Sequence, residues 1–217
     1  MTERELREEL CAVGRRLSER GYVTSYEGNL SARLPDGTIL CTPTMRCKSL
    51  LTPADLCTID LAGVQLCGAR ARTSEILMHL AIYRQRPDVQ AIVHSHPPHA
   101  TAFALTGEPI PNGVLAEVEV YLGVVPTVPY ETPGTQKFAD LVARHLDRTN
   151  TLLLANHGAV SFAATPERAL AFTEVLDAYC RVLLLARPLG AVRKMSEAQV
   201  TELLQLKRRL GFADPRS

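Results

Sequence analysis

Apolar residues recur along the chain at two spacings, one typical of helices and one typical of strands. Leu6, Leu10, Val13 and Leu17 lie three or four positions apart and predict a first helix, which Gly21 would end. The same helical spacing predicts four later helices, over residues 74–85, 135–148, 165–188 and 196–211.

Short apolar and β-branched runs predict strands at residues 30–34, 38–42, 56–59, 91–96 and 151–155. Pro35-Asp36-Gly37 separates the first two runs and is typical of a hairpin turn. Helices and strands are interleaved over residues 1–217 without a linker, a repeat or a low-complexity stretch, which predicts a single domain. Hairpin signals beside interleaved helices favour an α/β fold with a mixed, mainly antiparallel sheet over a parallel one.

The charges of the chain are balanced, with 24 Lys and Arg against 23 Asp and Glu and a formal net charge of +1. This balance gives no general attraction to nucleic acid or to an acidic membrane surface, so neither is an expected partner. No apolar run reaches the roughly 18 residues of a membrane span, and charged residues crowd the first ten positions, where a secretory signal would be apolar. We therefore expect a cytoplasmic protein whose six cysteines are reduced packing residues.

The histidines carry the clearest chemical pattern. His94 and His96 lie two positions apart in a predicted strand, so their imidazoles project from the same face. Two imidazoles at that separation can both bind a zinc ion, although such pairs also arise by chance. His157, which follows the predicted strand at 151–155, supplies the third nitrogen of a catalytic zinc site that keeps one position open. The alternative is three histidines in ordinary packing and turn positions.

A second pattern lies at the predicted start of the helix over residues 74–85. Thr73, Ser74 and Glu75 fit a helix cap followed by a carboxylate in the first turn. The same hydroxyls, with the free N–H groups of the helix start, also form an anion pocket, and Glu75 beside a metal fits a general base. The spacing alone leaves both interpretations open.

Other candidate positions are weaker. Gly28-Asn29 and Thr42-Pro43-Thr44 are either turns or further parts of such a site. His79 falls within a predicted helix and is expected to be a packing or surface residue, while neither His99 nor His145 has ligand spacing.

Taken in order, these motifs resemble those of the zinc-dependent class II aldolase family. That family contains L-fuculose-phosphate aldolase and L-ribulose-5-phosphate 4-epimerase, and the adducin head domain shares its fold. The resemblance runs over nearly the whole chain and implies a three-layer α/β/α sandwich and a homotetramer with sites between subunits. The matching residues are His94, His96 and His157 as zinc ligands, Glu75 as the acid/base, and Asn29, Thr44, Thr73 and Ser74 as phosphate-binding residues.

The resemblance implies retro-aldol cleavage of a ketose phosphate, such as L-fuculose 1-phosphate, to dihydroxyacetone phosphate and an aldehyde. Zinc would bind the keto and hydroxyl oxygens, and Glu75 would move a proton to or from the carbanion. The alternatives are a dehydratase of a methylthioribulose-phosphate-like substrate, a decarboxylase of a keto sugar acid phosphate, and a non-catalytic adducin-like domain. An epimerase is disfavoured because the family's epimerase carries Asp where this chain has Glu75.

Two positions depart from the aldolase pattern. Met45 stands where the aldolase has a glycine whose N–H binds phosphate, with Arg46 and Lys48 as nearby cations. The tyrosine that protonates the aldehyde oxygen in the aldolase has no counterpart, because Leu115 occupies its place. Selectivity for the second fragment is expected in residues 115–130 and in the C-terminal helices.

Overall fold

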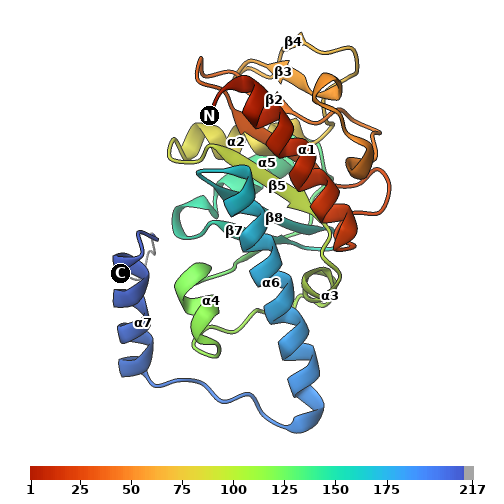
Figure 1. Ribbon diagram of the computed structural model, residues 1–217. Coiled ribbons are helices and arrows are strands. Elements are labelled where there is room, and N and C mark those ends of the chain that lie inside the picture. Colours follow the sequence, from red (N-terminus) through yellow and green to blue (C-terminus); the bar gives the residue numbers. More distant parts are fainter. Residues whose placement is uncertain (213–217) are drawn as a thin grey trace.

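An eight-stranded sheet forms the centre of the protein (Figure 1). The computed structural model describes residues 1–212, including every side chain but that of Arg148. The strand order is β4-β3-β2-β1-β5-β8-β7-β6, and among these strands every pairing except β6–β7 is antiparallel, as predicted. The strands are β1 (Asn29–Arg33), β2 (Ile39–Cys41), β3 (Cys57–Ile59), β4 (Gln65–Cys67), β5 (Ala91–Ser95), β6 (Thr127–Val128), β7 (Thr151–Leu154) and β8 (Gly158–Ala163).

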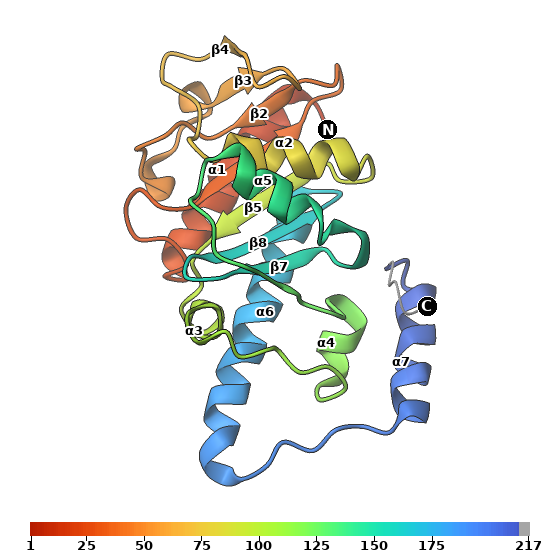
Figure 2. The ribbon, with the colours of Figure 1, turned by 180° about the vertical axis from the view of Figure 1, so that it is seen from behind.

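Helices cover both faces of the sheet and complete a three-layer arrangement (Figures 1 and 2). On one face α1 (Glu3–Glu19) contacts α6 (Pro166–Ala186), and α3 (Pro98–Thr106) lies beside α6. On the other face α2 (Ile76–Gln85) packs against α5 (Gln136–Ala143). The α/β/α sandwich implied by the resemblance is therefore confirmed.

Each face of the sheet has its own hydrophobic core. Because strand side chains alternate, Val93 of β5 packs into the core beneath α1 and α6, whereas Ile92 packs into the core beneath α2 and α5. His94 has the same parity as Ile92 and so projects on the α2 side. The alternation of one buried strand thus places an imidazole beside the start of α2.

Two further helices lie at one end of the molecule, where α4 (Ala116–Tyr121) packs against α7 (Glu197–Arg209) (Figure 1). The described part of the chain, residues 1–212, also contains four short 3₁₀ turns, at Lys48–Leu50, Pro53–Asp55, Leu146–Arg148 and Arg187–Leu189. Within residues 1–212, no helix combines the length and the apolar character needed to cross a membrane.

The predicted hairpin is confirmed, since β1 pairs with β2 and the Thr38 amide donates to Asp36 Oδ1 in the turn. The prediction of a single helix over residues 135–148 is wrong. α5 ends at Ala143, and the next turn tightens because the His145 N–H donates to the carbonyl of Val142, three residues back. The Arg86 guanidinium binds the carbonyl of Leu146 in the 3₁₀ turn that follows.

The sequence patterns missed several elements, among them α3, α4, β4, β6 and β8. The omission of β8 matters most, because this strand lies between β5 and β7 in the sheet. All six of its residues are buried, so the apolar–polar alternation that identifies a half-buried strand is absent from its sequence.

The cysteines meet the packing prediction at four of six positions. All six are free thiols; Cys11, Cys41, Cys57 and Cys180 are buried, and Cys47 is half-buried. The packing prediction is wrong for Cys67, which is exposed because it lies on β4, the edge strand of the sheet.

Candidate active site

Three histidines meet where β5 ends and where the turn between β7 and β8 leads into β8. His94 and His96 come from the end of β5, and His157 comes from the turn. One ring nitrogen from each histidine lies within 4.8 Å of the other two. The structure therefore brings together the three residues that the sequence spacing selected.

The separation of two of these nitrogens fits a tetrahedral metal site. Nε2 of His94 and Nε2 of His96 are 3.4 Å apart. Metal–nitrogen bonds of about 2.0–2.1 Å at tetrahedral angles place ligand nitrogens roughly 3.3 Å apart. Three imidazoles leave the fourth position of a tetrahedral ion open, which is the arrangement of a catalytic rather than a structural zinc site.

Hydrogen bonds behind the rings also suit metal binding. Nδ1 of His94 is 2.9 Å from the carbonyl oxygen of Ala159, which can only accept, so Nδ1 is the donor and Nε2 faces the cluster. Burial and the neighbouring His94 lower the pKa of His96 to about 3 and that of His157 to about 4. Both rings are therefore neutral near pH 7, the form in which an imidazole binds a metal.

Two glycines let the backbone approach these histidines closely. Gly28 has φ +73°, and a Cβ on it would lie 2.9 Å from the carbonyl oxygen of His94. A Cβ on Gly158 would lie 2.5 Å from Cδ2 of His96. A side chain at either position would displace the backbone or the ring that forms the cluster.

Glu75 lies immediately before α2 and points into the same cluster. Its Oε2 is 3.3 Å from Nε2 of His94, and its Oε1 is 3.6 Å from Nε2 of His157. Burial alone would raise the pKa of Glu75, but the neighbouring His94 and His157 and the donated hydrogen bond from Asn29 hold it well below its usual range. Glu75 is thus an ionised carboxylate beside two of the three clustered histidines.

The predicted anion-binding residues share one cavity of about 260 Å³ with this cluster. Its lining includes Asn29, Thr44, Thr73, Ser74, Glu75, His96 and His157. The Thr73 hydroxyl accepts the Glu75 N–H in the turn before α2. The prediction that Thr73 or Ser74 caps the helix is wrong, because α2 begins only at Ile76 and its N-cap Glu75 makes no side-chain capping bond. Ser74 is exposed and Thr44 is half-buried, which leaves their hydroxyls available to a ligand. Phosphate binding by these residues stays a prediction.

The departures near Thr44 have structural explanations. Met45 has φ +53°, the left-handed conformation that glycine adopts without strain, and its exposed side chain lines the cavity. Arg46 forms an ion pair with Asp55 at 3.3 Å. Lys48 is 1% exposed, and its ammonium donates to the carbonyls of Tyr26 and Arg46. Both cations therefore bind groups of the protein itself. These contacts hold the loop that carries Met45 in place.

The other histidines lie outside the metal cluster. His99 binds Asp177 through Nδ1 at 2.9 Å, and His145 is half-buried after α5. His79 is fully buried, so its packing prediction is confirmed, but it also hydrogen-bonds Asn29 and Ser31. The sequence patterns did not predict this polar network, although Glu75 and His79 have the i, i+4 spacing of one helix face.

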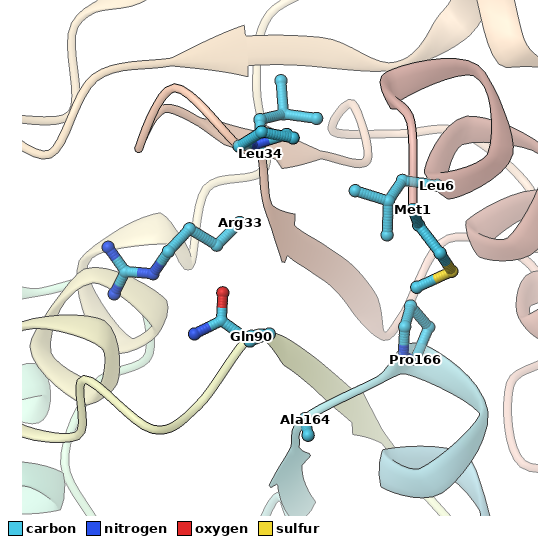
Figure 3. Close-up of a pocket in the computed structure, with 8 residues that line it drawn as sticks. Met1, Leu6, Arg33, Leu34, Gln90, Ala164 and Pro166 are labelled. Carbon is cyan, nitrogen blue, oxygen red and sulfur yellow. The ribbon is translucent and has the colours of Figure 1, made fainter.

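A second cavity, of about 200 Å³, offers no comparable chemistry (Figure 3). Its lining holds no imidazole, carboxylate or thiol, and consists of Met1, Leu6, Arg33, Leu34, Pro35, Gln90, Ala164 and Pro166. In Figure 3 the Arg33 guanidinium points away from Met1 and Leu6. It stacks instead on the ring of Tyr83, with 4.9 Å between the guanidinium carbon and the ring centre. Of these two cavities, the one beside Glu75 is therefore the candidate active site.

The fold is that of a known family of enzymes. The chain belongs to the class II aldolase and adducin N-terminal domain family, whose model matches residues 8–184. Among its relatives, the 3-oxo-tetronate 4-phosphate decarboxylase of Escherichia coli K12 is 33% identical over 93% of this chain and 96% of that protein. The L-fuculose phosphate aldolase of Methanococcus vannielii is 35% identical over 74% of this chain and 86% of that protein.

Solved structures agree with this membership. YgbL of Klebsiella pneumoniae superposes with a TM-score of 0.88 at 35% identity, covering 94% of this chain and 99% of that one. An L-fuculose 1-phosphate aldolase superposes with a TM-score of 0.87 at 26% identity, covering 96% and 97% of the two chains. The resemblance drawn from the sequence motifs is therefore confirmed.

Proposed function

We propose that the protein is a metal-dependent decarboxylase of a phosphorylated 3-oxo sugar acid, with 3-oxo-tetronate 4-phosphate as the first candidate. This substrate carries a carboxylate at C1, a hydroxyl at C2, a ketone at C3 and a phosphate on C4. Loss of CO₂ leaves the C1–C2 electron pair on C2, conjugated with the C3 carbonyl as an enediolate. Protonation at C2 then gives dihydroxyacetone phosphate, so the electron-rich species is the one that an aldolase of this family forms by releasing an aldehyde.

The observation that carries the proposal is a site equipped for an enediolate but without a tyrosine to exchange a proton with the oxygen of an aldehyde. Leu115, at the position of the aldolase tyrosine, is aliphatic and packs against the core at the start of α4. Tyr121, the tyrosine nearest to it in sequence, contacts the ring of Phe212. An aldol cleavage needs a group that takes the proton from the hydroxyl that becomes the aldehyde oxygen, and the same group returns it in the reverse reaction. A carboxylate that leaves as CO₂ has no such proton to lose. The main interpretation from sequence, a fuculose-phosphate aldolase, thus gives way to its stated alternative.

The relatives support the same choice of substrate. The E. coli K12 decarboxylase and its counterpart in E. coli O6:H1 strain CFT073 match 93% of this chain at 33% and 34% identity. The aldolase of Methanococcus vannielii matches a smaller share of the chain, 74%. Aldol cleavage is accordingly the second candidate reaction.

The residues of the cavity have distinct roles in the proposed reaction. His94, His96 and His157 would hold a divalent ion such as zinc, which would supply Lewis-acid stabilisation of the negative charge that develops as CO₂ leaves. The C2 hydroxyl keeps its proton. Glu75 takes up a proton from solvent and delivers it to C2 after CO₂ has left, so this proton replaces the lost carboxylate. The hydroxyls of Thr44, Thr73 and Ser74, with the N–H groups before α2, hold the phosphate.

The test is a comparison of two substrates by their products. The zinc-loaded protein receives [1-¹³C]3-oxo-tetronate 4-phosphate, generated in the assay, or L-fuculose 1-phosphate. The proposal expects enzyme-dependent ¹³CO₂ from the first and no aldehyde from the second. Dihydroxyacetone phosphate alone decides nothing, because both reactions release it. Because 3-oxo acids also lose CO₂ spontaneously, the Glu75→Gln protein measures the background rate of ¹³CO₂ release. Aldehyde release without ¹³CO₂ above this background would establish the aldolase instead.

The homotetramer with inter-subunit sites also belongs to this proposal. Val182 and Leu185 of α6, and Leu189 just after it, are exposed apolar residues of the kind that a subunit contact covers. Light scattering of the purified protein should then give four times the mass of the chain. A monomer in solution would contradict this part of the proposal.

A further inference from the structure

A chain of buried polar side chains leads from Glu75 into the layer between α2 and the sheet. Nδ2 of Asn29 donates to Oε2 of Glu75 at 2.7 Å, and Oδ1 of Asn29 is 2.6 Å from Nε2 of His79. Ser31 Oγ lies 2.7 Å from Nδ1 of the same imidazole and 2.8 Å from the hydroxyl of Tyr83. Asn29, Ser31, His79 and Tyr83 are each at most 5% exposed.

Two periodicities bring these residues together. Glu75, His79 and Tyr83 are four residues apart and lie on one side of α2 and the residue before it. Asn29 and Ser31 are two residues apart in β1 and project from the same face of the sheet. Asn29 of the strand contacts Glu75 and His79, and Ser31 contacts His79 and Tyr83. The hydrogen bonds therefore form one continuous network.

The hydrogen bonds of this network have one consistent direction. Oδ1 of Asn29 can only accept, so Nε2 of His79 carries a hydrogen and donates to it. Burial lowers the pKa of His79 to about 3, so the ring is neutral and its Nδ1 is an acceptor. The Ser31 hydroxyl therefore donates to Nδ1 and accepts from Tyr83. The reversed amide would place Oδ1 of Asn29 against the ionised carboxylate of Glu75, two acceptors without a hydrogen between them.

The two oxygens of Glu75 are consequently unlike. Oε2 accepts from Asn29 and faces His94 at 3.3 Å. Oε1 is buried and has no hydrogen-bond partner among the described residues. The network fixes one oxygen and leaves the other to exchange a proton with a ligand in the cavity.

We propose that His79 is a positioning residue: by donating to Oδ1 it sets the Asn29 amide, and the amide in turn holds Oε2 of Glu75 so that Oε1 faces the substrate. This inference rests on the proposed function, which makes Glu75 the group that moves the proton. It also changes the expected role of the Asn29 side chain, from phosphate binding to orientation of the carboxylate.

A matched pair of substitutions separates positioning from packing. His79→Gln keeps a side-chain N–H at the distance of Nε2, where it donates to Asn29. His79→Asn is too short to reach Asn29 and keeps a polar group only on the Ser31 side. We expect His79→Asn to lower kcat about 10–100-fold with little change in KM, and His79→Gln to retain kcat within a few-fold of the wild type. Equal losses of kcat in the two variants, or losses that follow the melting temperature, would overturn the proposal.

A second readout does not depend on the reaction. In ¹⁵N-histidine spectra of the protein, the network requires a hydrogen on Nε2 of His79 and none on Nδ1. The side-chain amide of Asn29 should exchange its hydrogens slowly in the wild type and in His79→Gln, and faster in His79→Asn. The opposite tautomer, or equal exchange in both variants, would overturn the positioning role. Absence of ¹³CO₂ release with these spectra as expected would count against the proposed decarboxylation and leave the network established.

Discussion

Gly158 and His96 are packed so closely that no side chain fits between them. A methyl group on Gly158 would lie 2.5 Å from Cδ2 of His96 and 2.6 Å from the carbonyl oxygen of Ser95. Gly158 begins β8 and follows His157 directly, while His96 follows β5. One contact therefore joins the two segments that carry the candidate metal ligands.

Gly158→Ala should weaken metal binding at least tenfold, because the added methyl group displaces either His96 or the strand beside it. The overlap should also lower the free energy of unfolding by about 1–3 kcal/mol, as overpacking does. Zinc affinity is measured by competition with a chromogenic chelator, and unfolding by urea.

Gly37→Ala is the control for this change. Gly37 has φ +86°, and a methyl group added to it would meet nothing within 4 Å, so its substitution costs backbone strain alone and should leave zinc affinity unchanged. Wild-type affinity in Gly158→Ala would show that the metal is held elsewhere.

The histidine cluster was predictable because short-range sequence features place most of its residues. Strand alternation placed His94 and His96 on one face, and a turn after a strand placed His157 at the same edge. The position of β8 was not predictable in this way, since uniform burial removed its periodic signal. The partnership of Asn29 with Glu75 depends on β1 pairing with β5, which sets Asn29 opposite His94, and such a long-range register has no local signature.

Metal affinity should fall as the pH decreases toward 6. Burial favours the neutral form of His94, but the adjacent Glu75 carboxylate outweighs it and raises the pKa of His94 above its ordinary value of 6.5. A metal binds the deprotonated ring, so protons compete with it as the pH falls through this raised pKa. Zinc titrations between pH 6 and 8 measure the effect.

Glu75→Gln should flatten this dependence. Without the carboxylate, burial is opposed mainly by the hydrogen bond to the Ala159 carbonyl, so the pKa of His94 falls and competition by protons begins at a lower pH. The slopes of affinity against pH are compared rather than the affinities, because Glu75 also attracts the cation directly. Equal slopes in the two proteins would contradict the assigned coupling between Glu75 and His94.

Met45→Gly should raise the free energy of unfolding by up to about 1 kcal/mol. Met45 is 67% exposed, so little packing is lost, and the left-handed φ of +53° costs a non-glycine residue about 1–2 kcal/mol. The greater freedom of glycine in the unfolded chain offsets part of this gain. Leu50→Gly is the control: Leu50 is 61% exposed but lies in a 3₁₀ turn, so its replacement should destabilise. Destabilisation of similar size in both variants would contradict strain at Met45.

The buried imidazole of His79 should make the protein sensitive to acid. Its pKa is lowered from 6.5 to about 3 by burial, so between these values the unfolded chain binds a proton that the folded protein does not. The free energy of unfolding therefore rises with pH across this window and falls on acidification, by up to about 1.4 kcal/mol per pH unit for one proton. His79→Gln removes the titrating group, so its free energy of unfolding should decrease less steeply from pH 6.5 to 4.

Ser31→Ala is the control, because it breaks the adjacent hydrogen bond but keeps the imidazole. Its free energy of unfolding, measured by urea titration, should change with pH as steeply as that of the wild type. A slope in His79→Gln as steep as that of Ser31→Ala would show that His79 is already protonated in the folded protein.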